Sequence, residues 1–235
     1  MSKLVQKMKL LQEYAGENGW FLCLQKLSGA VVHRSRDRLL AAKLKTSGMK
    51  LGKHPRLIGL NHIHLGVNFS AGNGFWLEAV TSFAGVNQQP LLIVGTNCNL
   101  SDSVHIGCVN RVTIGNNFLC GSHVIISDHN HGIYNSRQTD LVDSDPTIPP
   151  VQRPLSNDKS VCIGNNVWVG DGAAILGGAV IGDGVVIGAN AVVTGTIPPF
   201  TIAVGIPAKP VKQFNFEKQQ WIDFANAEPP ISPQI

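Results

Sequence analysis

The chain has 235 residues, 43% of them hydrophobic, which is enough to bury a full core in one elongated domain. Its five cysteines are odd in number and form no C-x-x-C pair, which favours reduced side chains in a cytoplasmic protein. Because there is no run of about 18 apolar residues and no secretory signal pattern, we expect neither a membrane span nor export.

The net charge of +4 is unevenly distributed. Residues 1–56 hold twelve Lys and Arg against three Asp and Glu, a net +9, so the remainder carries −5. Leu4, Met8 and Leu11 have helical spacing. We interpret residues 1–56 as a basic helical cap on the open end of a repeat fold, a segment that also suits peripheral contact with the inner membrane surface. No RNA-binding motif accompanies the charge, so nucleic acid is not an expected partner.

From residue 57 to residue 208 an aliphatic residue returns every sixth position, with interruptions. The period of six matches neither a helix nor a strand and is typical of a parallel β-helix. The most regular tract runs through Ile163, Val169, Ile175, Ile181, Ile187 and Val193, which we expect to point inward in a prism of five or six coils. Earlier tracts run through Leu65, Ala71, Leu77 and Phe83, then Val94, Leu100 and Ile106, then Ile114, Cys120 and Ile126. The slip at G-C-V-N-R predicts a turn that bulges outward.

The repeat vanishes in residues 127–160, which hold four prolines and predict an extended loop. The loop opens with I-S-D-H-N-H-G-I-Y. His129 and His131 are candidates for a general base, and Asp128 and Asn130 could orient one of them. The residues alone leave the choice between the two histidines open.

The last segment, residues 209–235, contains F-N-F-E-K-Q-Q-W-I-D-F. We expect a short helix packed against the prism, followed by an extended end. The fold class is therefore all-β, a parallel β-helix with a helix at each end.

Three segments together, I-G-N-N-V-W-V-G, D-H-N-H-G and A-V-G-I-P-A-K-P-V-K, resemble the hexapeptide-repeat acyltransferases. Across roughly residues 60–222 the chain is most similar to the O-acetyltransferases of lipopolysaccharide and capsule assembly. The resemblance implies a left-handed β-helix, a homotrimer, and transfer of an acetyl group from acetyl-CoA to a sugar hydroxyl, with no metal required.

The resemblance to galactoside and maltose acetyltransferases also implies site residues. Their catalytic His lies five residues after the last core aliphatic of its hexad. Counting from Ile126 gives His131 as the base, with His129 as the alternative. The same family pattern implies an acetyl-CoA site of Trp168, Asp171, Ala189, Thr194, Lys209 and Lys212. For the acceptor we expect Ser101, Asp102, Tyr134, Arg137 and Arg153.

Two other activities stay open at this point. A nucleotide-sugar amine as acceptor would make the protein an N-acetyltransferase. The γ-type carbonic anhydrases share the prism and bind zinc through three histidines, so His123, His129 and His131 offer an alternative zinc site.

Overall fold

The computed structural model describes residues 3–18, 20–134 and 142–226. Residues 1–40 and residues 41–235 form two compact units. The first unit contains α1 (Lys3–Asn18) and most of α2 (Trp20–Lys43). No helix among the described residues is both long and apolar enough to cross a membrane.

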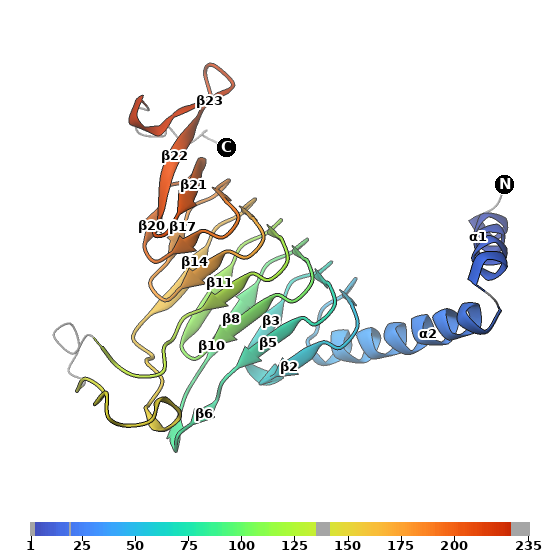
Figure 1. The fold of residues 1–235 in the computed structure, drawn as a ribbon, viewed down its shortest axis with the longest axis horizontal. Coiled ribbons are helices and arrows are strands. Elements are labelled where there is room, and N and C mark those ends of the chain that lie inside the picture. Colours follow the sequence, from blue (N-terminus) through green and yellow to red (C-terminus); the bar gives the residue numbers. More distant parts are fainter. Residues whose placement is uncertain (1–2, 19, 135–141, 227–235) are drawn as a thin grey trace. The chain divides into compact units, whose positions relative to one another are not determined.

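The second unit is a parallel β-helix built from three sheets, seen as stacked coils in Figure 1. Sheet A contains β1 (Lys50–Leu51), β4 (Ser70–Ala71), β9 (Asn99–Leu100), β12 (Leu119–Cys120), β15 (Trp168–Val169), β18 (Val186–Ile187) and β21 (Thr201–Gly205). Sheet B contains β2 (Arg56–Ile58), β5 (Trp76–Ala79), β10 (His105–Cys108), β13 (Ile125–Ser127), β16 (Ala174–Leu176) and β19 (Val192–Val193). Sheet C contains β3 (Ile63–Leu65), β8 (Leu91–Val94), β11 (Arg111–Ile114), β14 (Ser160–Ile163), β17 (Val180–Ile181) and β20 (Thr196–Ile197).

The chain passes from sheet A to B to C and repeats, so sheet B, with six strands, marks six coils. We call the turns between sheets A and B the A–B corner, and those between sheets B and C the B–C corner. The six aliphatic residues of the regular tract are each at most 2% exposed, which confirms the inward positions expected from the period of six.

The first coil begins before residue 57. Helix α2 ends at Lys43. β1 lies within residues 1–56, the segment expected to be helical, and β2 starts at its last residue, Arg56. Leu51 is buried, and with Leu57 and Ile63 it continues the period of six toward the N-terminus. The repeat was not recognised in this segment because the residues between Leu51 and Leu57 are glycine, proline and polar residues (52–56).

Two details of the upstream repeat were wrong. Phe83 is only half-buried, because the chain leaves the prism after Ala79 and forms the hairpin of β6 (Ser82–Phe83) and β7 (Val86–Asn87). The slip at G-C-V-N-R does not bulge outward with its apolar residues. Cys108 and Val109 are buried, so the apolar residues of the slip do not face solvent.

The expected C-terminal helix is also wrong. β22 (Ala208–Asn215) pairs antiparallel with β21, and β23 (Gln220–Asp223) pairs antiparallel with β22. The residues F-E-K-Q (216–219) form the hairpin turn, and Phe214 and Trp221 face each other across the hairpin with ring centroids 5.3 Å apart. The free edge of β21 accounts for the outcome, because its unpaired backbone groups offer hydrogen bonds that a helix would leave unused. Three short 3-10 turns complete the described structure, η1 (Leu60–His62), η3 (Pro150–Gln152) and η4 (Phe224–Asn226).

Candidate active site

Three successive coils depart from the regular repeat at the same B–C corner. The β6–β7 hairpin follows β5, the two-residue insertion follows β10, and the long loop follows β13. The hairpin and the loop lie side by side (Figure 1) and touch. The rings of Phe83 and His131 meet edge to face at 5.0 Å, and Asn157 Nδ2 donates to Gln88 Oε1 at 3.0 Å. Segments far apart in the sequence therefore meet around the candidate histidines.

Asp128 anchors this corner. Its side chain is completely buried, and its two carboxylate oxygens accept hydrogen bonds from the backbone N–H groups of Val109 and Asn110, both at 2.9 Å. Burial raises the pKa of the neighbouring Cys108 thiol to about 12, and the charge of Asp128 adds to that shift. Asp128 therefore ties the start of the long loop to the insertion in the coil below it.

His129 is held against this anchor. Its Nδ1 lies 2.9 Å from Asp128 Oδ1 and 3.4 Å from Ser127 Oγ, and its side chain is only 13% exposed. A carboxylate on Nδ1 fixes the ring orientation and leaves Nε2 as the free nitrogen.

His131 has a fixed backbone and an exposed side chain. It bridges to Leu155 across the loop, its carbonyl accepts from the Tyr134 hydroxyl at 2.6 Å, and the next residue, Gly132, donates to Pro154 O at 2.9 Å. Among the described residues, the ring of His131 contacts Phe83 and makes no side-chain hydrogen bond. The backbone N–H of Asn130, a residue expected to orient a histidine, instead donates to the Ser156 hydroxyl oxygen at 2.9 Å.

Two of the expected acceptor residues serve the loop itself. Arg153 donates to Ile148 O at 2.7 Å, to Pro146 O at 2.9 Å and to the Tyr134 hydroxyl at 3.1 Å. These bonds hold the loop closed around the guanidinium. Arg137, the third loop residue expected to meet the acceptor, lies outside the described residues.

Several of the other expected site residues lie at the A–B corner. Ser101 and Asp102 follow β9, Asp171 follows β15, and Ala189 follows β18. The carboxylate of Asp102 accepts from Asn73 N at 2.7 Å, and that of Asp171 accepts from Ser122 N at 2.5 Å, so both aspartates hold stacked turns together. Gly170 permits this stacking, because a Cβ there would lie 2.5 Å from Ala189 N. Thr194, by contrast, follows β19 at the B–C corner.

Trp168 and Lys212 lie on one outward row of sheet A. The strand register pairs Trp168 with Val186, Val186 with Ile202, and Ile202 with Lys212. Trp168 is 52% exposed. Three strand spacings separate it from Lys212, about 14 Å. A register shift in the β21–β22 pair puts Lys209 opposite Val204 and Lys212 opposite Ile202, so both lysines are exposed on the same face.

One chain does not bring all expected residues together. The histidines lie at the B–C corner, while Asp171 and Ala189 lie at the A–B corner, with sheet B between them. His123 is also at the A–B corner, apart from His129 and His131. Among the described residues, no group of three or more His, Cys, Asp or Glu is arranged to hold a metal ion.

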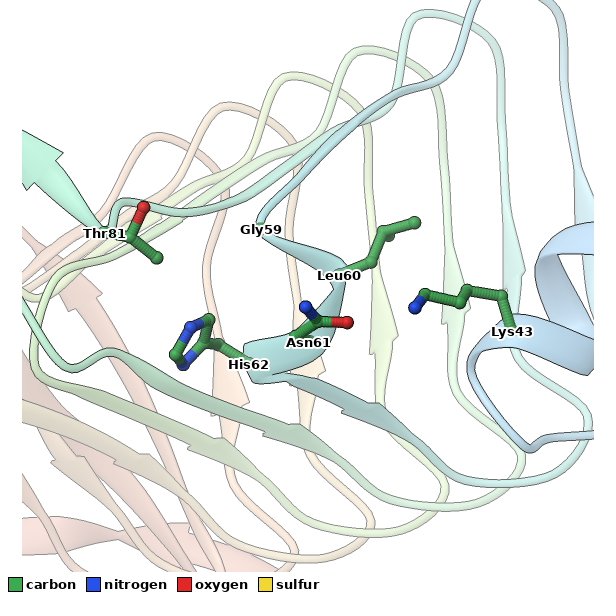
Figure 2. A pocket seen from close by; sticks show the side chains of 6 residues that line it. All are labelled: Lys43, Gly59, Leu60, Asn61, His62 and Thr81. Atoms are coloured by element: carbon green, nitrogen blue, oxygen red, sulfur yellow. The ribbon is translucent and has the colours of Figure 1, made fainter.

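A cavity of about 580 Å³ opens at the B–C corner of the first coil. Figure 2 shows its lining, with Lys43 and His62 as the basic side chains. None of the residues expected from the sequence lines it.

Sequence reasoning missed a pair of polar side chains beside His129. Glu78 and His105 lie on neighbouring strands of sheet B, with Glu78 Oε1 at 3.1 Å from His105 Nε2. Burial alone would raise the pKa of Glu78. The hydrogen bond from His105 and the charges of His105, His129 and Arg56 outweigh burial, so the pKa lies below its usual value. The two residues are 27 positions apart, and only the strand register brings them together.

Comparisons with known proteins define the family. The family model described as bacterial transferase hexapeptide (six repeats) matches residues 163–195. The chain is 40% identical over 159 residues to the Escherichia coli K12 protein WbbJ, named as a lipopolysaccharide biosynthesis O-acetyl transferase, covering 68% of this chain and 76% of WbbJ. It is 31% identical to the galactoside O-acetyltransferase of the same organism, covering 62% of this chain and 64% of that enzyme.

Two solved structures share the fold. A mutant of AntD, an N-acyltransferase from Bacillus cereus in complex with dTDP and coenzyme A, superposes with a TM-score of 0.56 at 17% identity, over 74% of this chain and 84% of AntD. A hexapeptide-repeat acetyltransferase from Vibrio cholerae superposes with a TM-score of 0.50 at 17% identity, over 89% and 93% of the two chains.

The chain belongs to the hexapeptide-repeat acyltransferases, as its sequence motifs predicted. Within that family it is an enzyme of the acetyltransferase class.

Proposed function

We propose that this enzyme transfers an acetyl group from acetyl-CoA to a hydroxyl of a sugar used in surface polysaccharide assembly. The observation that carries the proposal is the exposed imidazole of His131 on a backbone fixed by the loop, in a chain 40% identical to WbbJ. A base that must reach a bulky acceptor needs both exposure and a fixed position.

His131 is the general base in this proposal. One ring nitrogen takes the proton of the sugar hydroxyl as the oxygen attacks the thioester carbonyl carbon. The carbon–sulfur bond then breaks, and the leaving thiolate takes the proton from the imidazolium. His129 is the alternative base, because Asp128 fixes its ring and leaves Nε2 free. Its low exposure, 13%, favours a supporting role.

The donor side is the outward row of sheet A with the adjoining A–B corner. Trp168 would flank the thioester, and Ala189 would lie along the pantetheine arm. No described residue accepts a hydrogen bond from the Asp171 backbone N–H, so it is free to stabilise the tetrahedral oxyanion. Lys209 and Lys212, at the far end of the row, would meet the phosphates. Thr194 lies at the B–C corner, so it would contact acetyl-CoA only if two copies of the chain form the site.

The separation of the two corners supports a homotrimer of left-handed prisms. The B–C corner of one copy, with His131, would face sheet A and the A–B corner of the next copy. Ser101 and Asp102 would then reach the acceptor from the second copy, while Tyr134 and Arg153 shape the loop beside His131.

The basic N-terminal segment completes the proposal. The charge of +9 over residues 1–56 would favour contact with the inner surface of a membrane while the enzyme works in the cytoplasm.

The test uses purified protein, acetyl-CoA and a panel of sugars, with release of free CoA as the readout. His131→Ala should lower kcat by about 10²–10⁴-fold and leave the affinity for CoA nearly unchanged, because the base acts in the transition state. His129→Ala should lower kcat much less. The reverse order would make His129 the base. Unchanged turnover in both variants would contradict the mechanism.

Amino sugars belong in the panel, because AntD, which shares the fold, is an N-acyltransferase. Acetylation confined to amino sugars would mean that the enzyme is an N-acetyltransferase and not an O-acetyltransferase. A metal analysis of the same preparation tests the zinc alternative directly.

A further inference from the structure

Four residues converge on the outer face of sheet B, beside the proposed base. We call Glu78, His105, Gly107 and His129 the Gly107 patch. Glu78 and Gly107 are register partners on β5 and β10, and Gly107 is paired with Ser127 on β13. The β6–β7 hairpin, which carries Phe83 to the ring of His131, starts at Ser82, three residues after β5 ends at Ala79. The patch and His131 therefore flank the same hairpin.

The side chains of the patch are held in place. The ring of His105 stacks on Trp76 with centroids 4.0 Å apart, and the guanidinium of Arg56 covers Trp76 at 4.2 Å. Glu78 Oε1 accepts from His105 at 3.1 Å, and Asp128 fixes His129 at 2.9 Å. Such preorganised groups lose little entropy when a ligand binds.

Each polar member still has one free atom. Among the described residues, nothing hydrogen-bonds to Glu78 Oε2, His105 Nδ1 or His129 Nε2. The one buried polar side-chain atom without a partner in that part of the chain is Trp76 Nε1, so the three free atoms are open to solvent. The patch thus offers a carboxylate acceptor and two imidazole nitrogens to a ligand.

Gly107 leaves space at the centre of the patch. A Cβ at this position would lie 3.2 Å from His129 Cε1, 3.6 Å from His105 Nε2 and 3.8 Å from Glu78 Oε1. All three polar side chains therefore border one point, which any residue other than glycine would fill.

We infer that the Gly107 patch binds hydroxyl groups on an uncharged ring of the acceptor sugar and holds that sugar against His131. The inference rests on the proposed function, and it adds Glu78 and His105 as residues that position the acceptor. Neither the sequence motifs nor the relatives' names point to these residues.

The charge of the patch selects this ligand class. Glu78 stays ionised at neutral pH, because its pKa lies below the usual value. A carboxylate accepts from two sugar hydroxyls and repels a phosphate or a carboxylate. The nearby guanidinium of Arg56 is engaged on Trp76. An anionic group of the acceptor should therefore lie elsewhere.

The first test replaces Glu78 by Gln, which keeps the shape and removes the charge. The KM for the acceptor should rise about tenfold, while the KM for acetyl-CoA stays unchanged and kcat changes by less than about threefold. Glu217→Gln, on an exposed hairpin turn, is the matched control and should behave like the wild type. An unchanged acceptor KM in Glu78→Gln overturns the inference.

The second test fills the centre and removes no functional group. Gly107→Ala should raise the acceptor KM about fivefold or more, because the contact of 3.2 Å forces the His129 ring to move. Gly107 does not have a left-handed backbone, so alanine fits its conformation. Gly16→Ala, which meets nothing within 4 Å, is the matched control. Equal acceptor KM values in both variants overturn the inference.

A binding measurement separates this inference from the proposed function. Saturation-transfer NMR with a panel of methyl hexopyranosides reports sugar binding without any turnover. Signals seen with the wild type and lost in Glu78→Gln support the patch even if no acetylation occurs, in which case the proposed function fails alone. Acetylation that does not respond to Glu78→Gln leaves the function standing and overturns the inference. A wild type that binds none of the glycosides also overturns it.

Discussion

The buried carboxylate of Asp128 has two structural roles. It accepts two backbone hydrogen bonds from the insertion after β10, and it orients His129 at the start of the long loop. An aspartate at this position satisfies N–H groups that the two-residue insertion would otherwise leave unpaired. The residue that stabilises the irregular coil is therefore also the residue that sets the geometry next to His131.

Asp128→Ala should destabilise the protein by about 3 kcal/mol, because it leaves the N–H groups of Val109 and Asn110 and the imidazole of His129 without their partner. Urea unfolding measures the free energy change. Acetyl transfer should fall as well, since the loop start loses its anchor. Asp158→Ala, on an exposed part of the same loop, is the control and should leave the unfolding midpoint nearly unchanged. Equal stability of both variants would remove Asp128 from this role.

The sequence indicated some of these residues and hid others. His129 and His131 could be predicted from the sequence because they lie where the repeat stops. Glu78 and His105 could not be predicted, because each is a single polar residue at an outward strand position. Their meeting depends on the register of β5 and β10, which is set by where the coils close.

At the scale of elements, the period of six predicted the inward residues because each coil repeats the same strand and turn. It failed where the chain leaves the prism. Phe83 fits the period by count and lies in a hairpin instead. The aromatic segment near the C-terminus was expected to be helical, yet residues 208–215 and 220–223 form strands because β21 presents an open edge. Edges and exits depend on neighbouring coils, which a local period does not describe.

The β21–β22 hairpin gives a prediction at this scale. The register shift brings Lys209 and Lys212 to one face, so both can meet the phosphates of acetyl-CoA. Exposed charge contacts contribute up to about 1 kcal/mol each, or about fivefold in affinity. The double change to Ala should raise the KM for acetyl-CoA by about that factor per lysine and weaken its salt dependence, with kcat at saturation unchanged.

Lys218→Ala, on the turn of the β22–β23 hairpin, removes a similar exposed charge and is the control. Steady-state kinetics at two salt concentrations measure the effect. An unchanged KM for acetyl-CoA in the double variant would mean that the phosphates bind elsewhere.

At the scale of the whole molecule, the prism divides the chemistry between two corners. The histidines and the loop occupy the B–C corner, and the residues proposed for the donor, apart from Thr194, occupy sheet A and the A–B corner. The histidines follow β13, and Asp171 follows β15, the next strand but one in the chain. These two strands belong to successive coils, so both sets of residues lie at similar heights along the prism. Two copies related by rotation would bring one set against the other without any change in the fold.

This division predicts complementation between two inactive variants. His131→Ala removes the proposed base from the B–C corner of its chain. Trp168→Ala removes the indole ring from the donor face of sheet A in its chain. If each site combines two copies, a trimer assembled from both variants contains interfaces at which an intact His131 faces an intact Trp168. Random assembly from equal amounts makes about a quarter of the sites intact. Refolding the two variants together should therefore restore about a quarter of the wild-type activity, whereas refolding either alone restores almost none.

Light scattering should give about three times the 25.2 kDa chain mass for every preparation. Trimers of the mixture that stay inactive would place both residues in a site within one chain.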